Sequence, residues 1–268
     1  MNASRFGDLE VLCHSPAELT AHTTPLLFVH GAYTGAWCWE EHFLPWFAER
    51  GWTAYAVSLS GHGKSLHHDH LDALSIDDYV NDVAAVVARL PGAPVLIGHS
   101  MGGMVVQKYL ERATAPAAVL MASVPPQGLM GSAFGLMFKK PHLLADLNRL
   151  MSGGEAQLES LREALFHQPI EAPALRRYYA LSQPESHRAI WDMTLFNLPQ
   201  PGRMRDVPML VLGASHDQLI PPDQVMMTAA TYGLKAEIFD DLGHGMMLEH
   251  GWEGVAERIA VWLDTQGM

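Results

Sequence analysis

The sequence predicts an α/β fold in which a mostly parallel sheet is covered by helices on both faces. Short apolar runs alternate with segments of helical periodicity, which is the pattern of parallel strands joined by crossover helices. The alternation stops near residue 125 and resumes near residue 204, and no strand-like run lies between these points. We therefore predict a core formed by residues 1–124 and 204–268, with a helical cap inserted at residues 125–203.

The composition indicates a globular chain and excludes some classes of partner. Of 268 residues, 49% are hydrophobic and 17% are charged, which is ample for a sizeable core. The formal net charge of −12 argues against nucleic-acid binding, which needs clustered Lys and Arg. No apolar run approaches the length of a membrane span, and the N-terminus lacks a signal pattern. We expect a cytoplasmic protein in which Cys13 and Cys38 are free thiols.

The first half of the chain contains the clearest strand and helix patterns. A weak strand pattern covers residues 5–15. Ser75 and Asp78 predict a capping box at the start of an amphipathic helix that extends to about Leu90. The elbow strand described below is followed by a helix over 101–113. Buried-strand runs are predicted at 26–29, 53–57, 94–97 and 117–121.

The second half contains the predicted cap and then two more strands. Helical segments inside the cap are separated by Pro and Gly residues, at about 141–151, 155–166, 173–182 and 185–195. A strong strand pattern at 208–213 is followed by a helix that begins after Pro221-Pro222. The last strand is predicted at 236–239 and is followed by a closing amphipathic helix.

A candidate nucleophile lies in the stretch Gly98-His99-Ser100-Met101-Gly102, which has the form Gly-x-Ser-x-Gly. An apolar strand precedes the serine and a helical pattern follows it. Such a sharp strand-to-helix turn brings backbone segments close together, which only small flanking residues allow. The turn exposes the serine hydroxyl at the N-terminus of a helix. We interpret Ser100 as a catalytic nucleophile rather than a serine in a structural turn.

A serine nucleophile needs a base, and the base needs an orienting carboxylate. In this architecture the acid and the base follow the serine along the chain, each at the carboxyl end of a strand. Asp217 follows the strand at 208–213 and is the predicted acid. His244, in Leu242-Gly243-His244-Gly245, follows the last strand and is the predicted base.

Other residues compete for these roles. Asp223 follows two prolines and is typical of a first-turn helix residue. Asp240 and Asp241 end the last strand and would reach the site only with difficulty. His250 is placed at the start of the closing helix, and is a weaker candidate base than His244.

An oxyanion hole requires two N–H donors directed at one point. The backbone of Met101, directly after the nucleophile, is one predicted donor, and Ala32 in the loop after His30-Gly31 is the other. The hydroxyl of Tyr33 could add a third donor, or its ring could pack against the cap. His30 and His99 abut strand ends, so we expect them to organise the backbone.

These motifs together give the chain a resemblance to a known family. His-Gly before the oxyanion loop, Gly-His-Ser-Met-Gly-Gly at the elbow, a late Asp and a Gly-His loop resemble an α/β-hydrolase with an inserted helical cap. The stretch His30-Gly-Ala-Tyr-Thr-Gly-Ala-Trp-Cys-Trp39 is similar to plant methylesterases, hydroxynitrile lyases and related bacterial carboxylesterases. The resemblance implies a serine hydrolase without a metal or organic cofactor.

Three positions depart from patterns in that family. The lyases tend to carry Thr and Lys where this chain has Gly31 and Gly245, so both departures favour ester hydrolysis over cyanohydrin cleavage. Ser58 stands where an Asp that braces a loop usually precedes Gly-x-Gly-x-Ser, so we expect this loop to lack that brace.

We therefore predict a carboxylesterase that acts on a small-molecule ester through an acyl-enzyme, with apolar acyl or alkyl groups of small to medium size. Lactone, thioester or C–C bond hydrolysis, cyanohydrin lysis and a non-catalytic binding role remain alternatives, as does an accessory role. The sequence leaves a homodimer open.

The His67-His68-Asp69-His70 run is interpreted as a solvated loop rather than a metal site. The residues predicted to line the substrate pocket are Tyr33, Phe134, Met137, Phe138, Trp191, Phe196, Leu219 and Met246.

Overall fold

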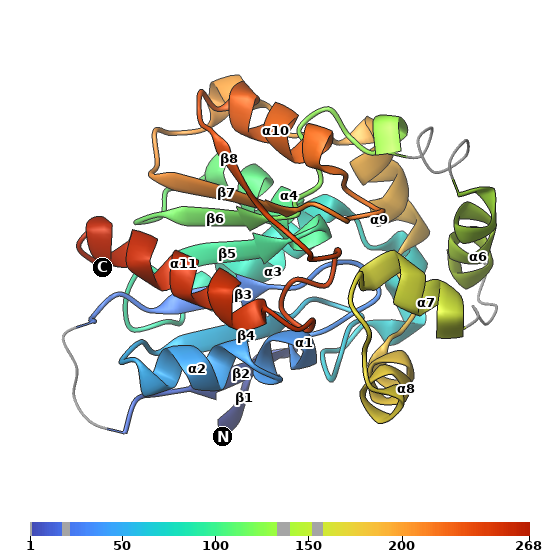
Figure 1. The fold of residues 1–268 in the computed structure, drawn as a ribbon. Coiled ribbons are helices and arrows are strands. Elements are labelled where there is room, and N and C mark those ends of the chain that lie inside the picture. Colours follow the sequence, from blue (N-terminus) through green and yellow to red (C-terminus); the bar gives the residue numbers. More distant parts are fainter. Residues whose placement is uncertain (1, 18–21, 133–139, 152–157) are drawn as a thin grey trace.

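The computed structural model describes residues 2–17, 22–132, 140–151 and 158–268. The described chain is built around an eight-stranded sheet with the strand order β1-β2-β4-β3-β5-β6-β7-β8 (Figure 1). The six strands from β3 to β8 are parallel to one another, which confirms the predicted mostly parallel sheet. The strands are β1 (Asn2–Phe6), β2 (Leu9–His14), β3 (Leu26–Val29), β4 (Ala54–Ser58), β5 (Val95–His99), β6 (Ala118–Met121), β7 (Met209–Ala214) and β8 (Ala236–Phe239).

The N-terminal edge differs from the single weak strand that the sequence predicts. The chain there forms a hairpin, in which β1 pairs antiparallel with β2, and β2 pairs antiparallel with β4. Gly7 lies in the turn with a φ of 70°, a conformation that glycine adopts without the steric cost of a Cβ atom. The apolar alternation along this segment is too weak to show where one strand ends and the next begins.

Helices cover both faces of the sheet, because successive side chains of each buried strand point to opposite faces. In β3, Leu26 and Phe28 pack with residues of α1, α2 and α11, whereas Leu27 and Val29 pack with residues of α3, α4 and α10. The capping box predicted at Ser75 is present at the start of α3. These helices are α1 (Trp37–Glu40), α2 (Phe43–Glu49), α3 (Ile76–Val87), α4 (Met101–Leu110), α10 (Pro222–Thr231) and α11 (Trp252–Thr265).

In the described part of the chain between β6 and β7, helices are joined by turns and irregular segments, and no strand is present. Helices α6, α7 and α8 lie beyond one end of the strands, on the right in Figure 1. The boundaries predicted for a separate cap, residues 125 and 203, stay a prediction. The helices in this part are α6 (Pro141–Met151), α7 (Leu158–Leu165), α8 (Ala172–Leu181) and α9 (His187–Trp191), with one π-helical turn, η2 (Asp192–Phe196).

Three further observations bear on the predictions from the sequence. Short 3-10 turns occur at η1 (His68–Ala73) and η3 (Pro201–Arg203), and η1 has no buried residue. Cys13 and Cys38 are free thiols, as predicted. Within the described ranges, every helix is too short or too polar to cross a lipid bilayer.

Candidate active site

The turn between β5 and α4 presents Ser100 in a strained backbone conformation. Its φ of 53° and ψ of −117° are rare for a residue with a side chain. A Cβ atom at Gly98 would lie 2.4 Å from the carbonyl oxygen of Gly102, and one at Gly102 would lie 2.3 Å from the carbonyl oxygen of Val29. Both contacts involve backbone atoms, which cannot rotate away. The two glycines of the motif are therefore required by the close packing of the turn.

The predicted acid and base are in direct contact. His244 Nδ1 lies 2.7 Å from Asp217 Oδ2, and both side chains are buried. Asp217 Oδ1 accepts hydrogen bonds from the backbone N–H groups of Leu219 and Ile220, each at 2.8 Å. A carboxylate can only accept hydrogen bonds, so His244 Nδ1–H is the donor to Asp217 Oδ2. In the neutral ring, Nε2 then has no proton and carries the lone pair that a general base needs.

The competing residues do not share this environment. Asp223 is exposed in the first turn of α10, and Asp240 and Asp241 are also exposed. Asp217 and His244 follow β7 and β8, which are neighbouring parallel strands, so their loops meet at one edge of the sheet. The topology therefore brings together the two residues that were predicted from their positions in the sequence.

His99 connects the turn that carries Ser100 to the loop that carries His244. Its Nε2–H donates to the carbonyl oxygen of His244 at 2.9 Å, and the two imidazole centroids are 4.6 Å apart. Burial, reinforced by the neighbouring His244, lowers the pKa of His99 well below its ordinary value, so the ring is neutral. The residue next to Ser100 thus holds the backbone of His244 in place, as expected for a residue that organises the backbone.

The loop after β3 lies against Ser100. A Cβ atom at Gly31 would be 3.0 Å from Ser100 Cβ. The carbonyl oxygen of Gly31 accepts hydrogen bonds from His30 Nδ1 at 2.8 Å and from Thr34 Oγ1 at 2.9 Å. The C=O and N–H of a trans peptide point in opposite directions, so these two bonds also fix the direction of the Ala32 N–H.

The protonation state of His30 is set by its surroundings. Its Nε2 accepts a hydrogen bond from the N–H of Leu59 at 3.0 Å, which leaves Nδ1 as the donor to Gly31. Burial, together with the nearby His62, lowers the pKa of His30 to about 3. The ring is therefore neutral near neutral pH, in the tautomer that orients the loop after β3. The other predicted donor, Met101, is the first residue of α4, where helix geometry leaves N–H groups unpaired.

The loop at Ser58 is braced, contrary to the expectation drawn from the missing Asp. The Ser58 hydroxyl donates to Glu10 Oε2 at 2.7 Å and accepts from the N–H of Ala36 at 3.0 Å. Glu10 Oε2 also accepts from the N–H of Lys64 at 3.0 Å. A carboxylate from β2, paired with the serine, therefore occupies the bracing role. The sequence could not reveal this, because Glu10 is distant from Ser58 along the chain.

Glu249 is a second structural residue that the sequence analysis did not identify. Its carboxylate accepts backbone hydrogen bonds from Gly243 at 2.6 Å, and from His167 and Gln168 at 2.5 Å each. Burial raises the pKa of Glu249, and the three N–H donors oppose that rise. The side chain thereby fixes the residue before His244 to the connection between α7 and α8.

The residues predicted to line the substrate pocket have varied surroundings. Tyr33 has a positive φ of 65°, and burial raises the pKa of its hydroxyl. Trp191 and Phe196 are 56% and 70% exposed. Leu219 packs beside Leu143 and Ala164, while Met246 is fully buried in the core. Phe134, Met137 and Phe138 lie outside the described residues. Their contact with a substrate stays a prediction.

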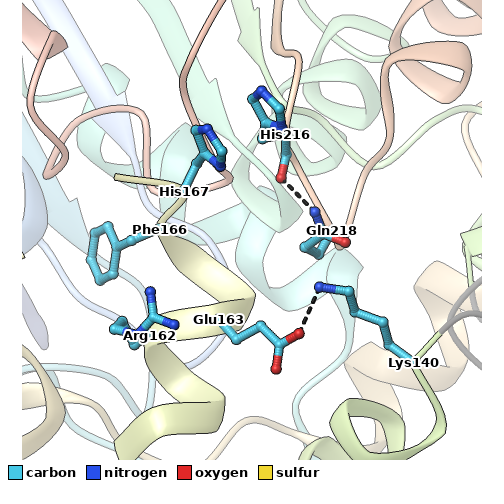
Figure 2. A pocket seen from close by; sticks show the side chains of 7 residues that line it. All are labelled: Lys140, Arg162, Glu163, Phe166, His167, His216 and Gln218. Carbon is cyan, nitrogen blue, oxygen red and sulfur yellow. Dashed lines mark hydrogen bonds and ion pairs between the residues drawn. The ribbon is translucent and has the colours of Figure 1, made fainter. Parts of the chain in front are cut away.

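A polar cavity of about 240 Å³ adjoins the loop that carries Asp217 (Figure 2). His216 and Gln218 flank Asp217 in the sequence and line this cavity, and Lys140 pairs there with Glu163 at 2.6 Å. None of these four residues was among the predicted substrate contacts. The complete lining is Lys140, Arg162, Glu163, Phe166, His167, His216 and Gln218.

Comparison with known proteins identifies the family of this chain. Residues 26–258 match the model of the alpha/beta hydrolase family. The chain is 26% identical over 214 residues to a pyrethroid hydrolase of Sphingobium wenxiniae, covering 74% of this chain and 72% of that protein. It is 32% identical over 111 residues to a pFDCC methylesterase of Arabidopsis thaliana, covering 40% and 42%.

A solved structure shares the fold along nearly the whole chain. An esterase from Exiguobacterium antarcticum superposes with a TM-score of 0.78 at 20% identity, covering 96% of this chain and 95% of that one. The resemblance inferred from the motifs is confirmed in both its superfamily and its methylesterase relatives. The chain belongs to the α/β hydrolase family.

Proposed function

We propose that the protein is a serine hydrolase that cleaves carboxylic esters through an acyl-enzyme. The observation that carries this proposal is the buried 2.7 Å hydrogen bond between His244 Nδ1 and Asp217 Oδ2. That bond leaves His244 Nε2 as the base, and His99, the residue beside Ser100, ties the loop of His244 to the turn that carries Ser100. The similar proteins named as a pyrethroid hydrolase and a methylesterase also support ester hydrolysis.

In the proposed cycle, Ser100 Oγ attacks the ester carbonyl carbon while His244 Nε2 takes its proton. Asp217 holds the imidazole in the required tautomer and stabilises the imidazolium that forms. The N–H groups of Ala32 and Met101 stabilise the tetrahedral oxyanion. His244 returns the proton to the departing alcohol, and water then hydrolyses the acyl-enzyme with His244 again acting as base.

Two glycines favour ester hydrolysis over cyanohydrin cleavage on the same residues. A Cβ atom at Gly31 would lie 3.0 Å from His99 Nδ1 and from Ser100 Cβ. A Cβ atom at Gly245 would lie 2.9 Å from the Phe166 ring and 3.2 Å from the Leu165 carbonyl oxygen. The Thr and Lys side chains of the lyases would therefore require neighbouring groups to shift at both positions.

The experiment that tests this proposal compares wild type with Ser100→Ala on p-nitrophenyl esters of increasing acyl length, a lactone and an acyl-thioester. We expect ester turnover to fall by about 10⁴-fold or more in S100A. A fluorophosphonate probe should label wild type and fail to label S100A. Ser182→Ala, at the end of α8, is the matched control and should retain both properties. Unchanged turnover or labelling in S100A would overturn the proposal.

A further inference from the structure

Three side chains with metal-ligating atoms meet outside the proposed catalytic residues. They are His167, between α7 and α8; His216, after β7; and Asp241, after β8. One ligand atom from each lies within 4.8 Å of the others. The two imidazoles are stacked with their centroids 3.5 Å apart and their planes 6° from parallel, at the edge of the cavity in Figure 2. His216 Nε2 lies 4.0 Å from Asp241 Oδ1.

The backbone that carries these side chains is held by other groups. The N–H of His216 donates to the carbonyl oxygen of Leu242 at 2.9 Å. The side-chain amide of Gln168 donates to the carbonyl oxygen of Asp241 at 2.7 Å, and the Glu249 carboxylate accepts from the N–H of His167. Three separate segments of chain are thus fixed next to one another. Only side-chain torsions remain to be adjusted, and all three side chains are exposed and can rotate.

The donor set favours a particular class of ion. Two imidazole nitrogens and one carboxylate oxygen suit Zn²⁺, with water as a fourth ligand, and suit Ca²⁺ or Mg²⁺ poorly. Bonds of about 2.1 Å to a tetrahedral ion place ligand atoms roughly 3.4 Å apart. The 4.0 Å separation between His216 Nε2 and Asp241 Oδ1 therefore needs to shrink by about 0.6 Å, and ligand atoms as much as 4.8 Å apart need to approach by about 1.4 Å. The rings must also turn out of their parallel stack so that both lone pairs converge on the ion.

We propose that His167, His216 and Asp241 form a binding site for a divalent transition-metal ion of the Zn²⁺ type. His216 directly precedes Asp217, and Asp241 lies on the loop that leads to His244. His167 belongs to the helical segment between β6 and β7. A bound ion links that segment to both loops of the proposed acid and base, and it stabilises the folded chain by mass action.

The test uses the full chain, treated with a chelator and titrated with Zn²⁺ alone by calorimetry and thermal unfolding. We expect one ion per chain with a micromolar Kd, and a rise in Tm with Zn²⁺ concentration. His167→Gln, His216→Gln and Asp241→Asn should each weaken binding by about 10-fold or more. His68→Gln, in the exposed His67–His70 run, is the matched control and should bind as wild type does.

Co²⁺ provides a second readout that separates this site from other histidines. Visible absorption bands of a nitrogen-coordinated Co²⁺ should appear in wild type and H68Q and be lost in H167Q and H216Q. Circular dichroism of each variant before titration shows that the fold is retained. Absence of stoichiometric Zn²⁺ binding, or binding that H167Q and H216Q leave unchanged, would overturn the proposal. Because every readout is binding, the outcome is independent of ester turnover.

Discussion

Asp217→Asn is the sharpest perturbation of the proposed mechanism, because the structure determines which way the new amide must face. Asp217 Oδ1 accepts from the N–H groups of Leu219 and Ile220, while Oδ2 accepts from His244 Nδ1. An NH₂ group in the Oδ1 position would face two donors and leave both unpaired, at a cost of about 1–3 kcal/mol each. The amide oxygen therefore keeps that position, and the NH₂ group faces His244.

The amide then forces His244 into the wrong tautomer. Its Nδ1 must accept from the NH₂ group, so Nε2 carries the proton and cannot take one from Ser100. In serine hydrolases of this design, the same change lowers kcat by about 10⁴-fold, or about 5.4 kcal/mol of activation free energy. We expect a loss of this size in p-nitrophenyl ester turnover, with KM little changed because Asp217 is buried behind the base.

Asp223→Asn makes the same chemical change in a nearby exposed residue and serves as the matched control. Its kcat should stay within about twofold of wild type. Circular dichroism and thermal unfolding check that D217N is folded. A D217N variant that keeps kcat within about tenfold of wild type would refute the tautomer reasoning. A larger loss in D223N than in D217N would assign the acid role to Asp223.

Three further predictions follow from the groups that position the site. Thr34→Val removes one of the two donors to the Gly31 carbonyl, so steady-state kinetics should show kcat lowered by about 3- to 10-fold at similar KM. Glu249→Gln leaves too few acceptor positions for three backbone N–H groups, and urea unfolding should show a free energy of unfolding lowered by about 1–3 kcal/mol. His30 has a folded pKa of about 3, below its ordinary 6.5. As pH falls from 6.5 towards 3, the His30 side chain takes up a proton in the unfolded chain but not in the folded chain. The free energy of unfolding should therefore fall by up to about 1.4 kcal/mol per pH unit in this range, and His30→Gln should make this pH dependence weaker.

Each of these predictions has its own control. Thr34→Ser keeps the hydroxyl and should restore most of kcat, and equal losses in T34V and T34S would contradict an orienting role. Glu257→Gln changes an exposed carboxylate in the middle of α11 and should leave the free energy of unfolding within about 0.5 kcal/mol of wild type. A pH dependence of stability that is identical in wild type and H30Q would show that His30 is not the group responsible.

The sequence by itself determined the features that depend on residues close to one another along the chain. The strand before Ser100, the helix after it and the two glycines of the motif are local patterns, and each corresponds to a local steric requirement in the structure. The positions of Asp217 and His244 after consecutive strands were also visible, because parallel strands end at the same edge of a sheet.

Only the tertiary structure decided which distant side chains meet. The Glu10 carboxylate beside Ser58, the three N–H groups around Glu249 and the stacked rings of His167 and His216 come from separate segments. No periodicity or spacing encodes such pairs, because each depends on how the strands are ordered and on where the helical segment between β6 and β7 packs. The fold class of this chain can therefore be predicted from patterns along the sequence. The contacts that position its candidate site can be identified only from the tertiary structure, because the sheet brings together loops that are distant in the sequence.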